Sequence, residues 1–205
     1  MNVLDILGTA LGFLYLWLEF RTSPWMWVVG SIMPAIYIVV LYQAGIYADC
    51  GMEVYYFLAG IYGLVIWLRG KTEQGEQVAI RPTPCRTYVW LALTFVVLFV
   101  AIAVFLREFT DSRVPYIDSF TTSLSIIAMW MLSRKYIEQW WVWLVVDAVS
   151  SGLYIYKGVY GRSLLYAVYT VMAVYGYYTW RKATKGIDAE KRQEQTKIIH
   201  REFVN

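Results

Sequence analysis

The sequence predicts an all-α integral membrane protein with seven transmembrane helices. The first observation is composition: of 205 residues, 59% are hydrophobic, 18% are aromatic and only 16% are charged. The second is that the apolar residues form long spans rather than short amphipathic stripes. The third is an internal repeat that relates the two halves of the chain. Together these observations exclude a soluble globular domain.

Seven apolar spans follow one another, and short turns rich in Arg, Lys, Gly and Pro separate them. The predicted spans cover residues 3–20, 24–43, 50–68, 87–106, 116–133, 139–157 and 163–181. We expect four regions: a first three-helix bundle at 1–68, a loop and linker helix at 69–115, a second bundle at 116–182 and a cytoplasmic tail at 183–205. The tail is charged, so we expect it to be solvated and partly helical or disordered.

The repeat aligns residues 5–67 with residues 118–180 at a constant offset of 113, without a gap. Fourteen of the 63 pairs are identical, and many of these are Trp, Gly or charged residues rather than interchangeable aliphatic ones. The extra span at 87–106 lets the second unit enter the membrane in the same direction as the first. We therefore predict a SWEET-like 3+1+3 arrangement of parallel three-helix bundles with a substrate site near the membrane midplane. The alternative is that the duplication only builds a stable bundle for a receptor or scaffold.

The distribution of basic residues predicts the orientation in the membrane. If the spans alternate, four of the 18 Lys and Arg residues lie on the amino-terminal side and fourteen lie on the opposite side. We therefore expect the amino terminus outside the cytoplasmic membrane and the tail in the cytoplasm. Six acidic residues also gather on the outer side, which favours a cationic solute.

The sixth span contains a carboxylate, which is costly in hydrocarbon and normally faces a cavity or a partner. At helical spacing one face of this span carries aromatic rings, the carboxylate and hydroxyls, from Trp140 and Trp143 through Asp147 to Ser151 and Tyr154. Such a face could hold a flat cationic ring by cation–π contact and hydrogen bonding. The alternative is that the tryptophans are interfacial anchors and the carboxyl group is a structural helix contact.

Other spans add further candidate binding residues. In the third span Glu53 begins a face that continues with Tyr56, whose repeat partner in the seventh span is Tyr169. Glu53 lies near the outer end of its span, where it could instead be a solvated helix end. Thr122 in the fifth span could bind a ligand, although Ser and Thr in membrane helices often bond their own backbone.

Metal, cofactor and enzyme chemistry are not expected. Cys50 and Cys85 lie far apart without a CxxC pairing, and the only histidine, His200, is in the tail. No nucleophile–base pair lies within the spans, and no motif indicates a nucleic-acid partner. The expected surroundings are the lipid bilayer and a small solute, and an oligomer is compatible with the sequence.

Several sequence runs carry a family resemblance. They are the DSFTTSLS run from Asp118, the EQWWVW run from Glu138, the YGYYTW run from Tyr175 and Ile61-Tyr62-Gly63 ahead of Trp67. The chain from its first span to Trp180 resembles the PnuC-type vitamin transporters. The resemblance implies a 3+1+3 fold, uptake of a vitamin without an ATPase, and trapping of the solute by a cytoplasmic kinase. Members are associated with nicotinamide riboside, and their relatives with thiamine or riboflavin.

The choice of vitamin depends on few residues. The nicotinamide riboside group favours an amide in the third span where this chain has Glu53, and a carboxylate suits an aminopyrimidine or a cation. The sequence therefore resembles the thiamine-type branch, and we expect thiamine ahead of nicotinamide riboside, with neutral riboflavin third. Facilitated diffusion is the expected mechanism, and proton coupling through Asp147 is the alternative.

Overall fold

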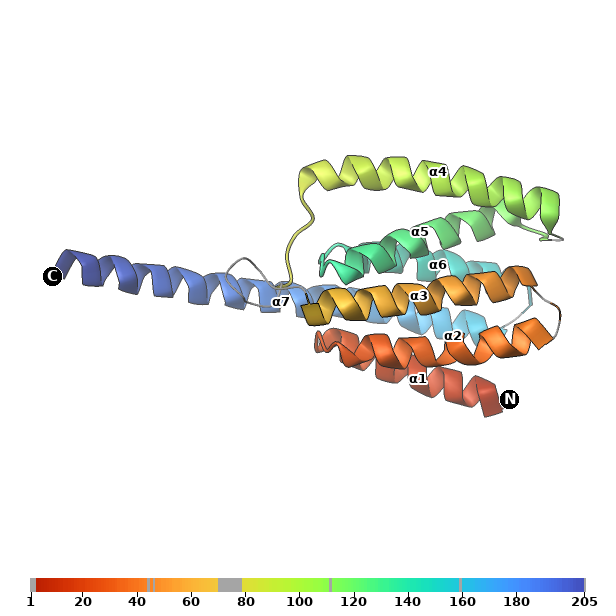
Figure 1. Cartoon of the computed structure of the whole chain (residues 1–205), viewed down its shortest axis with the longest axis horizontal. Coiled ribbons are helices and arrows are strands. Elements are labelled where there is room, and N and C mark those ends of the chain that lie inside the picture. The colour runs from red at the N-terminus through yellow and green to blue at the C-terminus, as the bar shows by residue number, and fades with distance from the viewer. Residues whose placement is uncertain are drawn as a thin grey trace. The chain divides into compact units, whose positions relative to one another are not determined.

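The computed structural model of this chain describes the backbone of residues 3–43, 45, 47–69, 79–110, 112–158 and 160–204, and the side chains of these residues except 3–6, 47–49 and 187–204. The described part contains seven α-helices (Figure 1). They are α1 (Val3–Phe20), α2 (Trp25–Gln43), α3 (Tyr47–Arg69), α4 (Cys85–Phe109), α5 (Pro115–Ser133), α6 (Gln139–Tyr156) and α7 (Tyr160–Val204). The predicted all-helical class with seven helices is confirmed.

Three of the described helices contain segments that are long and apolar enough to cross a membrane on their own: Trp25–Gln43, Cys50–Arg69 and Cys85–Phe109. The last segment is the whole of α4. Its large apolar side chains are mostly exposed, for example Trp90 at 69% and Val97 at 67%. A helix satisfies its own backbone hydrogen bonds, so such a surface is stable in lipid but not in water.

The turns between helices use left-handed backbone at four described positions. Thr22 and Lys135 have φ values of 54° and 55°, and each stands two residues after the end of a helix. Gly45 and Gly158 have φ values of 75° and 74° at the turns after α2 and α6. Glycine is the residue that adopts this conformation without strain, which explains its place at both turns. The members of each pair are 113 residues apart, which is the offset of the sequence repeat.

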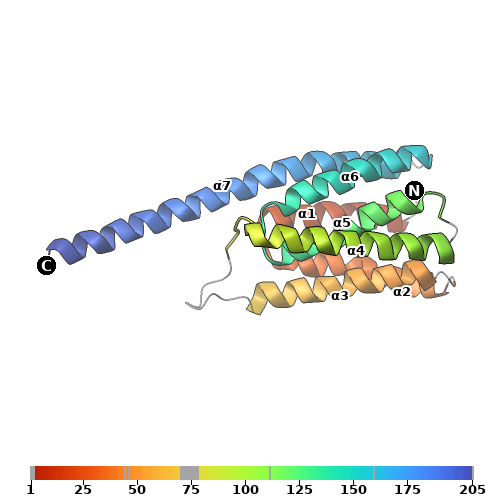
Figure 2. The ribbon, with the colours of Figure 1, turned by 90° about the horizontal axis from the view of Figure 1, so that it is seen from above.

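The seventh span was predicted to end at residue 181, and helix α7 continues well past it to Val204. Figures 1 and 2 show it running far beyond the end of its neighbour α6. The segment after Trp180 contains one glycine and no proline, and it is rich in Lys, Glu, Gln and Arg. These residue types have high helix propensity, so the helix continues beyond the end of the apolar segment.

The described contacts divide the chain into two compact units. Unit 1 comprises residues 1–78 with 129–134, and unit 2 comprises 79–128 with 135–205. The last turn of α5 thus packs in unit 1, whereas the rest of that helix belongs to unit 2. The division predicted from the repeat, at 1–68, 69–115, 116–182 and 183–205, stays a prediction.

In unit 1, helix α2 packs along α3 and α1 packs on α2. The indole of Trp27, which is 2% exposed, lies against Gly63 of α3 so closely that a Cβ at Gly63 would stand 2.5 Å from ring atoms. The edge of Trp67 meets the same indole, with ring centroids 5.9 Å apart and planes at 84°. Trp67 Nε1 donates a hydrogen bond to the carbonyl oxygen of Leu132 at 3.3 Å, which fixes the end of α5 to α3.

In unit 2, helix α6 packs along α7 by a contact of the same kind. The indole of Trp140, which is 1% exposed, lies against Gly176, where a Cβ would stand 2.6 Å from ring atoms. Trp180 meets Trp140 edge-on, with ring centroids 5.6 Å apart and planes at 89°. The Trp, Gly and Trp of this contact stand 113 residues after their counterparts in unit 1. The local packing therefore follows the repeat, and the complete 3+1+3 arrangement stays a prediction.

The connection before α4 docks on the turn between α5 and α6. Arg81 N donates to the carbonyl oxygen of Lys135 at 3.1 Å, and Ile137 N donates to that of Arg81 at 3.1 Å, so a parallel bridge pairs Arg81 with Tyr136. Both the N–H and the Oγ1–H of Thr83 donate to Glu138 Oε2, at 2.8 and 2.7 Å. We call this contact of residues 80–83 with residues 135–138 the loop clasp.

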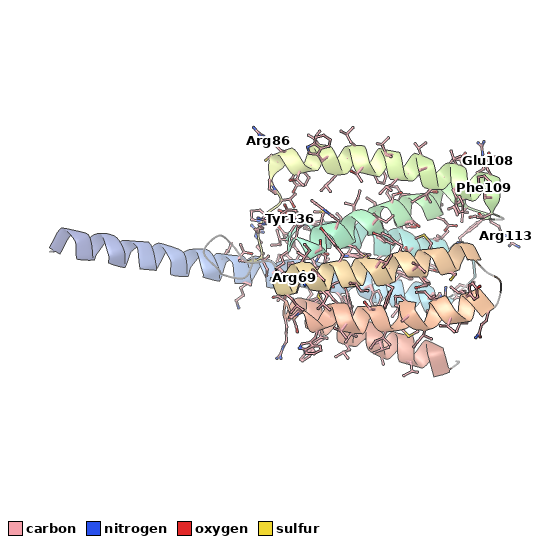
Figure 3. All side chains as sticks on the ribbon, viewed as in Figure 1. Arg69, Arg86, Glu108, Phe109, Arg113 and Tyr136 are labelled. Atoms are coloured by element: carbon pink, nitrogen blue, oxygen red, sulfur yellow. The ribbon has the colours of Figure 1, made fainter. Side chains whose placement is uncertain are left out.

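The loop clasp buries polar groups at one end of unit 2. Thr83 is 7% exposed and Lys135 is 8% exposed, and desolvation by this burial lowers the pKa of the Lys135 ammonium. In Figure 3, Tyr136 and Arg86 lie at this end of unit 2, and Glu108 and Arg113 lie at its other end. Helix α4 therefore leads away from the clasp, with Arg86 near its first turn and Glu108 in its last.

Candidate functional site

The candidate site lies in unit 2, where α6 presents its predicted polar and aromatic face. Helix α6 begins at Gln139, directly after the loop clasp, and a short turn at Gly158 returns the chain into α7. The two helices therefore run antiparallel and side by side. An ion pair between Lys157 Nζ and Asp118 Oδ1, at 3.1 Å, joins the end of α6 to the start of α5.

Three predicted site residues on this face contact the protein itself. Trp140 packs on Gly176 and Trp180, as described above. Ser151 Oγ donates to the carbonyl oxygen of Ser163 at 3.0 Å and lies 3.2 Å from its hydroxyl. Tyr154 stacks on Tyr166 of α7. These contacts hold α6 to α7, and a direct contact of these three residues with a solute stays a prediction.

Two other predicted residues of the same face have no such partner. Within the described residues no hydrogen bond or ion pair engages the carboxyl group of Asp147, although this residue is only 7% exposed. No ring contact or hydrogen bond there engages Trp143, which is half-buried. The two residues stand four positions apart and so share one face of α6. A buried carboxyl group with no hydrogen-bond or ion-pair partner among the described residues is costly, so this face of α6 stays the candidate for a contact with a solute.

Helix α7 contributes Tyr169 to the surroundings of this carboxyl group. Tyr169 is half-buried, and its ring lies close enough to Asp147 for the two groups to interact electrostatically. Its neighbour Tyr166 meets it edge-on, with ring centroids 6.0 Å apart and planes at 73°. The structure thus brings together a carboxyl group of α6 and tyrosine rings of α7.

Helix α5 contributes one hydroxyl that its own backbone does not use. Most of its Ser and Thr hydroxyls donate to carbonyl oxygens one turn earlier: Ser119, Thr121, Ser123 and Ser125 all do so, at 2.6 to 3.1 Å. Among the described residues no hydrogen bond engages Thr122, which is half-buried. Bonding to the helix backbone thus accounts for the neighbouring hydroxyls and leaves that of Thr122 available among the described residues.

Glu53 and Tyr56 lie on α3 in unit 1, and both are half-buried. They stand three positions apart on one helix, as the sequence indicated. The ring of Tyr56 meets that of Tyr55 at 5.5 Å and 63°. Their part in binding a solute stays a prediction.

Sequence reasoning did not select Tyr166, Arg162 or Ser163 as site residues. Tyr166 stacks on Tyr154, with ring centroids 5.3 Å apart and planes at 17°, and Arg162 Cζ lies 5.7 Å from the centroid of Tyr154. The repeat register held one signal, because it places Tyr166 at the position equivalent to Glu53. Nothing in the local sequence indicated that Arg162 would lie on a ring of α6.

Comparisons with known proteins agree with this picture. The nicotinamide riboside transporter PnuC of Escherichia coli is 27% identical over 204 residues, covering 88% of this chain and 85% of that protein. The riboflavin/roseoflavin transporter RibM of Streptomyces davaonensis is 25% identical over 178 residues, covering 86% of this chain and 83% of that protein. These relatives are membrane transporters of vitamins, which agrees with the expectation that the chain is not an enzyme.

A solved structure shares the fold. The crystal structure of the vitamin B3 transporter PnuC superposes with a TM-score of 0.70 at 24% identity, covering 89% of this chain and 82% of that chain. The sequence profile of the family described as nicotinamide mononucleotide transporter matches residues 2–182, which include all seven helices up to the start of the tail. The chain therefore belongs to the nicotinamide mononucleotide transporter family, and the predicted resemblance to PnuC-type vitamin transporters is confirmed.

Proposed function

We propose that this protein carries nicotinamide riboside across the membrane by facilitated diffusion. The observation that carries the proposal is the buried carboxyl group of Asp147, which has no hydrogen-bond or ion-pair partner among the described residues. Relatives that match most of the chain are named nicotinamide riboside transporters, in Escherichia coli and in Neisseria mucosa. The sequence alone favours thiamine. Because of these relatives, we place nicotinamide riboside ahead of it.

The chemistry of this solute suits the site. Its ring is aromatic and permanently cationic, and it also carries a carboxamide and a sugar. An ionised Asp147 would gain the counter-charge that the protein does not supply, and electrostatic attraction is strong where water is excluded. Trp143, one turn away, offers a ring face for cation–π contact. The hydroxyls of Thr122 and Tyr169 can bond the carboxamide or the sugar.

The direction of transport in this proposal comes from chemistry outside the protein. The solute equilibrates through the carrier, and a cytoplasmic kinase then adds a charged phosphate that prevents its return. The proposal includes the predicted topology, with the amino terminus outside the cytoplasmic membrane and the tail in the cytoplasm. An oligomer is compatible with this mechanism, which uses one chain.

The experiment is a binding titration of the purified protein with nicotinamide riboside, thiamine and riboflavin. We expect nicotinamide riboside to bind most tightly. Asp147→Asn should weaken its binding by a factor of about 30 or more, because removing one partner of a buried charge pair costs about 2 kcal/mol or more. Asp118→Asn is the matched control, since that carboxylate already pairs with Lys157. Absence of nicotinamide riboside binding, or equal effects of the two variants, would refute the proposal.

Thiamine is the second candidate, and Glu53 is the residue that favours it. A half-buried carboxylate on α3 suits an amino-bearing ring or a cation better than it suits a carboxamide. Glu53→Gln keeps the size of the side chain and removes its charge. If thiamine is the solute, its affinity in this variant falls by a factor of about ten, or about 1.4 kcal/mol. Unchanged thiamine binding by a folded Glu53→Gln variant removes the case for thiamine.

A further inference from the structure

An arginine at the end of α5 contacts aromatic side chains of unit 1. Arg134 follows Ser133, the last residue of that helix. Its Cζ lies 5.6 Å from the ring centroid of Trp130, and its Nη2 donates a long hydrogen bond of 3.4 Å to the hydroxyl oxygen of Tyr62. No ion pair engages its guanidinium among the residues that the structure describes. The positive charge of Arg134 is therefore not neutralised within that part of the chain.

Arg134 and Tyr62 keep hydrogen-bond donors that the described residues do not use. The Nε of Arg134 is buried and has no hydrogen-bond partner there, and its Nη1 makes no hydrogen bond there but keeps accessible surface. Tyr62 is 43% exposed, and its hydroxyl accepts the bond from Arg134 while no described acceptor takes its own hydrogen. A partly buried cation is costly without an anion nearby. A phosphate group can supply that anion, because its oxygens match the guanidinium and also accept from a hydroxyl.

The repeat places the same pairing of arginine and tryptophan at the end of α1. Arg21 follows α1 directly, and its Cζ lies 4.4 Å from the ring centroid of Trp17. The backbone N–H of each arginine donates to the carbonyl oxygen of the tryptophan four residues earlier, at 3.3 Å in both repeats. No hydroxyl bonds the guanidinium of Arg21 among the described residues. The tryptophan contact is thus common to both repeats, and the hydroxyl of Tyr62 distinguishes the end of α5.

An exposed apolar stripe of α3 leads away from the hydroxyl of Tyr62. Its members Val54, Leu58 and Ile61 follow helical spacing and are 39%, 57% and 42% exposed, and Tyr62 stands four positions after Leu58. On a membrane helix such a surface contacts acyl chains. A diffusible phosphate would use only the polar donors, whereas a phospholipid uses both the donors and the stripe.

We propose that Arg134 and Tyr62 bind the phosphate of an anionic phospholipid, with an acyl chain of that lipid along the stripe of α3. The ends of membrane helices lie at the level of the lipid headgroups, where tryptophan is also enriched. In the proposed topology this end of α5 faces the cytoplasmic leaflet, whose anionic lipids attract basic residues. The binding does not depend on which vitamin the protein carries.

The test measures lipid binding to the purified full chain in a nonionic detergent by native mass spectrometry. The wild type should bind phosphatidylglycerol more tightly than phosphatidylcholine, because the choline cation of the latter opposes an arginine. Arg134→Gln should lower the affinity for phosphatidylglycerol about tenfold, because a charge-assisted hydrogen bond is lost. Tyr62→Phe removes one accessible hydroxyl and should lower that affinity about threefold.

Arg69→Gln is the matched control, since it removes the same charge at the end of α3 (Figure 3). Arg69 is exposed and has no ring contact or side-chain hydrogen bond among the described residues, so screening by salt should keep its effect below about twofold. Equal losses in Arg134→Gln and Arg69→Gln would mean that general surface charge alone attracts the lipid, which would overturn the site.

Two further outcomes would remove an anionic phospholipid as the occupant. One is equal affinity of the wild type for the two lipids. The other is displacement of phosphatidylglycerol by an equal concentration of inorganic phosphate, which would make the site one for a soluble anion. If Arg134→Gln does not fold, Tyr62→Phe decides: a threefold loss of affinity supports the site, and unchanged affinity refutes it.

Discussion

Replacing Gly176 by alanine should destabilise the protein, because the added methyl group would overlap a fixed indole. The new Cβ would stand 2.6 Å from Cη2 and Cζ3 of Trp140 and 2.7 Å from Cδ2. Carbon atoms in contact prefer separations of about 3.5–4.0 Å, so ring or helix must move by roughly 1 Å. The ring is 1% exposed and lies against Trp180, which leaves it little room to move.

The change in the free energy of unfolding caused by Gly176→Ala is the sum of two opposing effects. Overpacking of this kind costs about 1–3 kcal/mol, whereas replacing glycine by alanine inside a helix gains about 1 kcal/mol. Gly152→Ala is the matched control, because Gly152 lies within α6 and a Cβ there meets nothing within 4 Å. The gain in helix propensity is common to both variants, so the difference between them isolates the overlap. We expect Gly176→Ala to be less stable than Gly152→Ala by about 1–3 kcal/mol.

The assay is thermal unfolding of the purified protein in detergent at one fixed scan rate, since membrane proteins often unfold irreversibly. At this chain length the expected difference corresponds to about 2–4 °C in Tm per kcal/mol. Trp140→Leu in the Gly176→Ala background should recover part of the loss by making room. Gly63→Ala, compared with Gly51→Ala, should show the same penalty in unit 1, where a Cβ at Gly63 would stand 2.5 Å from Trp27. Equal stability of Gly176→Ala and Gly152→Ala would refute the packing argument.

Two further predictions concern the loop clasp and the aromatic face. Glu138→Ala should lower the free energy of unfolding by about 1–3 kcal/mol, because two buried donors of Thr83 lose their acceptor. The control is Glu108→Ala, which removes an exposed ion pair and should leave the Tm unchanged. Trp143→Ala should weaken solute binding by about 1–2 kcal/mol in a titration. Trp141→Ala should leave binding unchanged, because Trp141 is 45% exposed and packs on Tyr177. Equal losses of affinity in the two variants would make both residues structural.

Much of the fold could be predicted because hydrophobic length and turn residues determine where membrane helices begin and end. The span expected at 24–43 is observed at Trp25–Gln43, between a proline and a turn with a left-handed glycine. The sequence placed the end of the seventh span at residue 181 and left the tail as partly helical or disordered, whereas α7 continues to Val204. A hydropathy pattern reports where the apolar segment ends, and helix-forming residues continue past that point. The loop clasp was missed because its bridge joins Arg81 to Tyr136, and no local pattern marks a contact between residues so far apart in sequence.

The candidate site shows where periodicity stops being informative. Helical spacing places Trp140, Trp143 and Asp147 on one face, and nothing in that spacing separates a packing ring from a binding ring. The partner helix gives the information that spacing lacks: Gly176 opposite Trp140 leaves a notch that the indole fills, while no ring contact or hydrogen bond among the described residues engages Trp143. The same logic distinguishes Thr122 from its back-bonded neighbours on α5. A polar or aromatic group that a tightly packed bundle leaves unengaged is the feature that a ligand can use, because the bundle already stabilises the others.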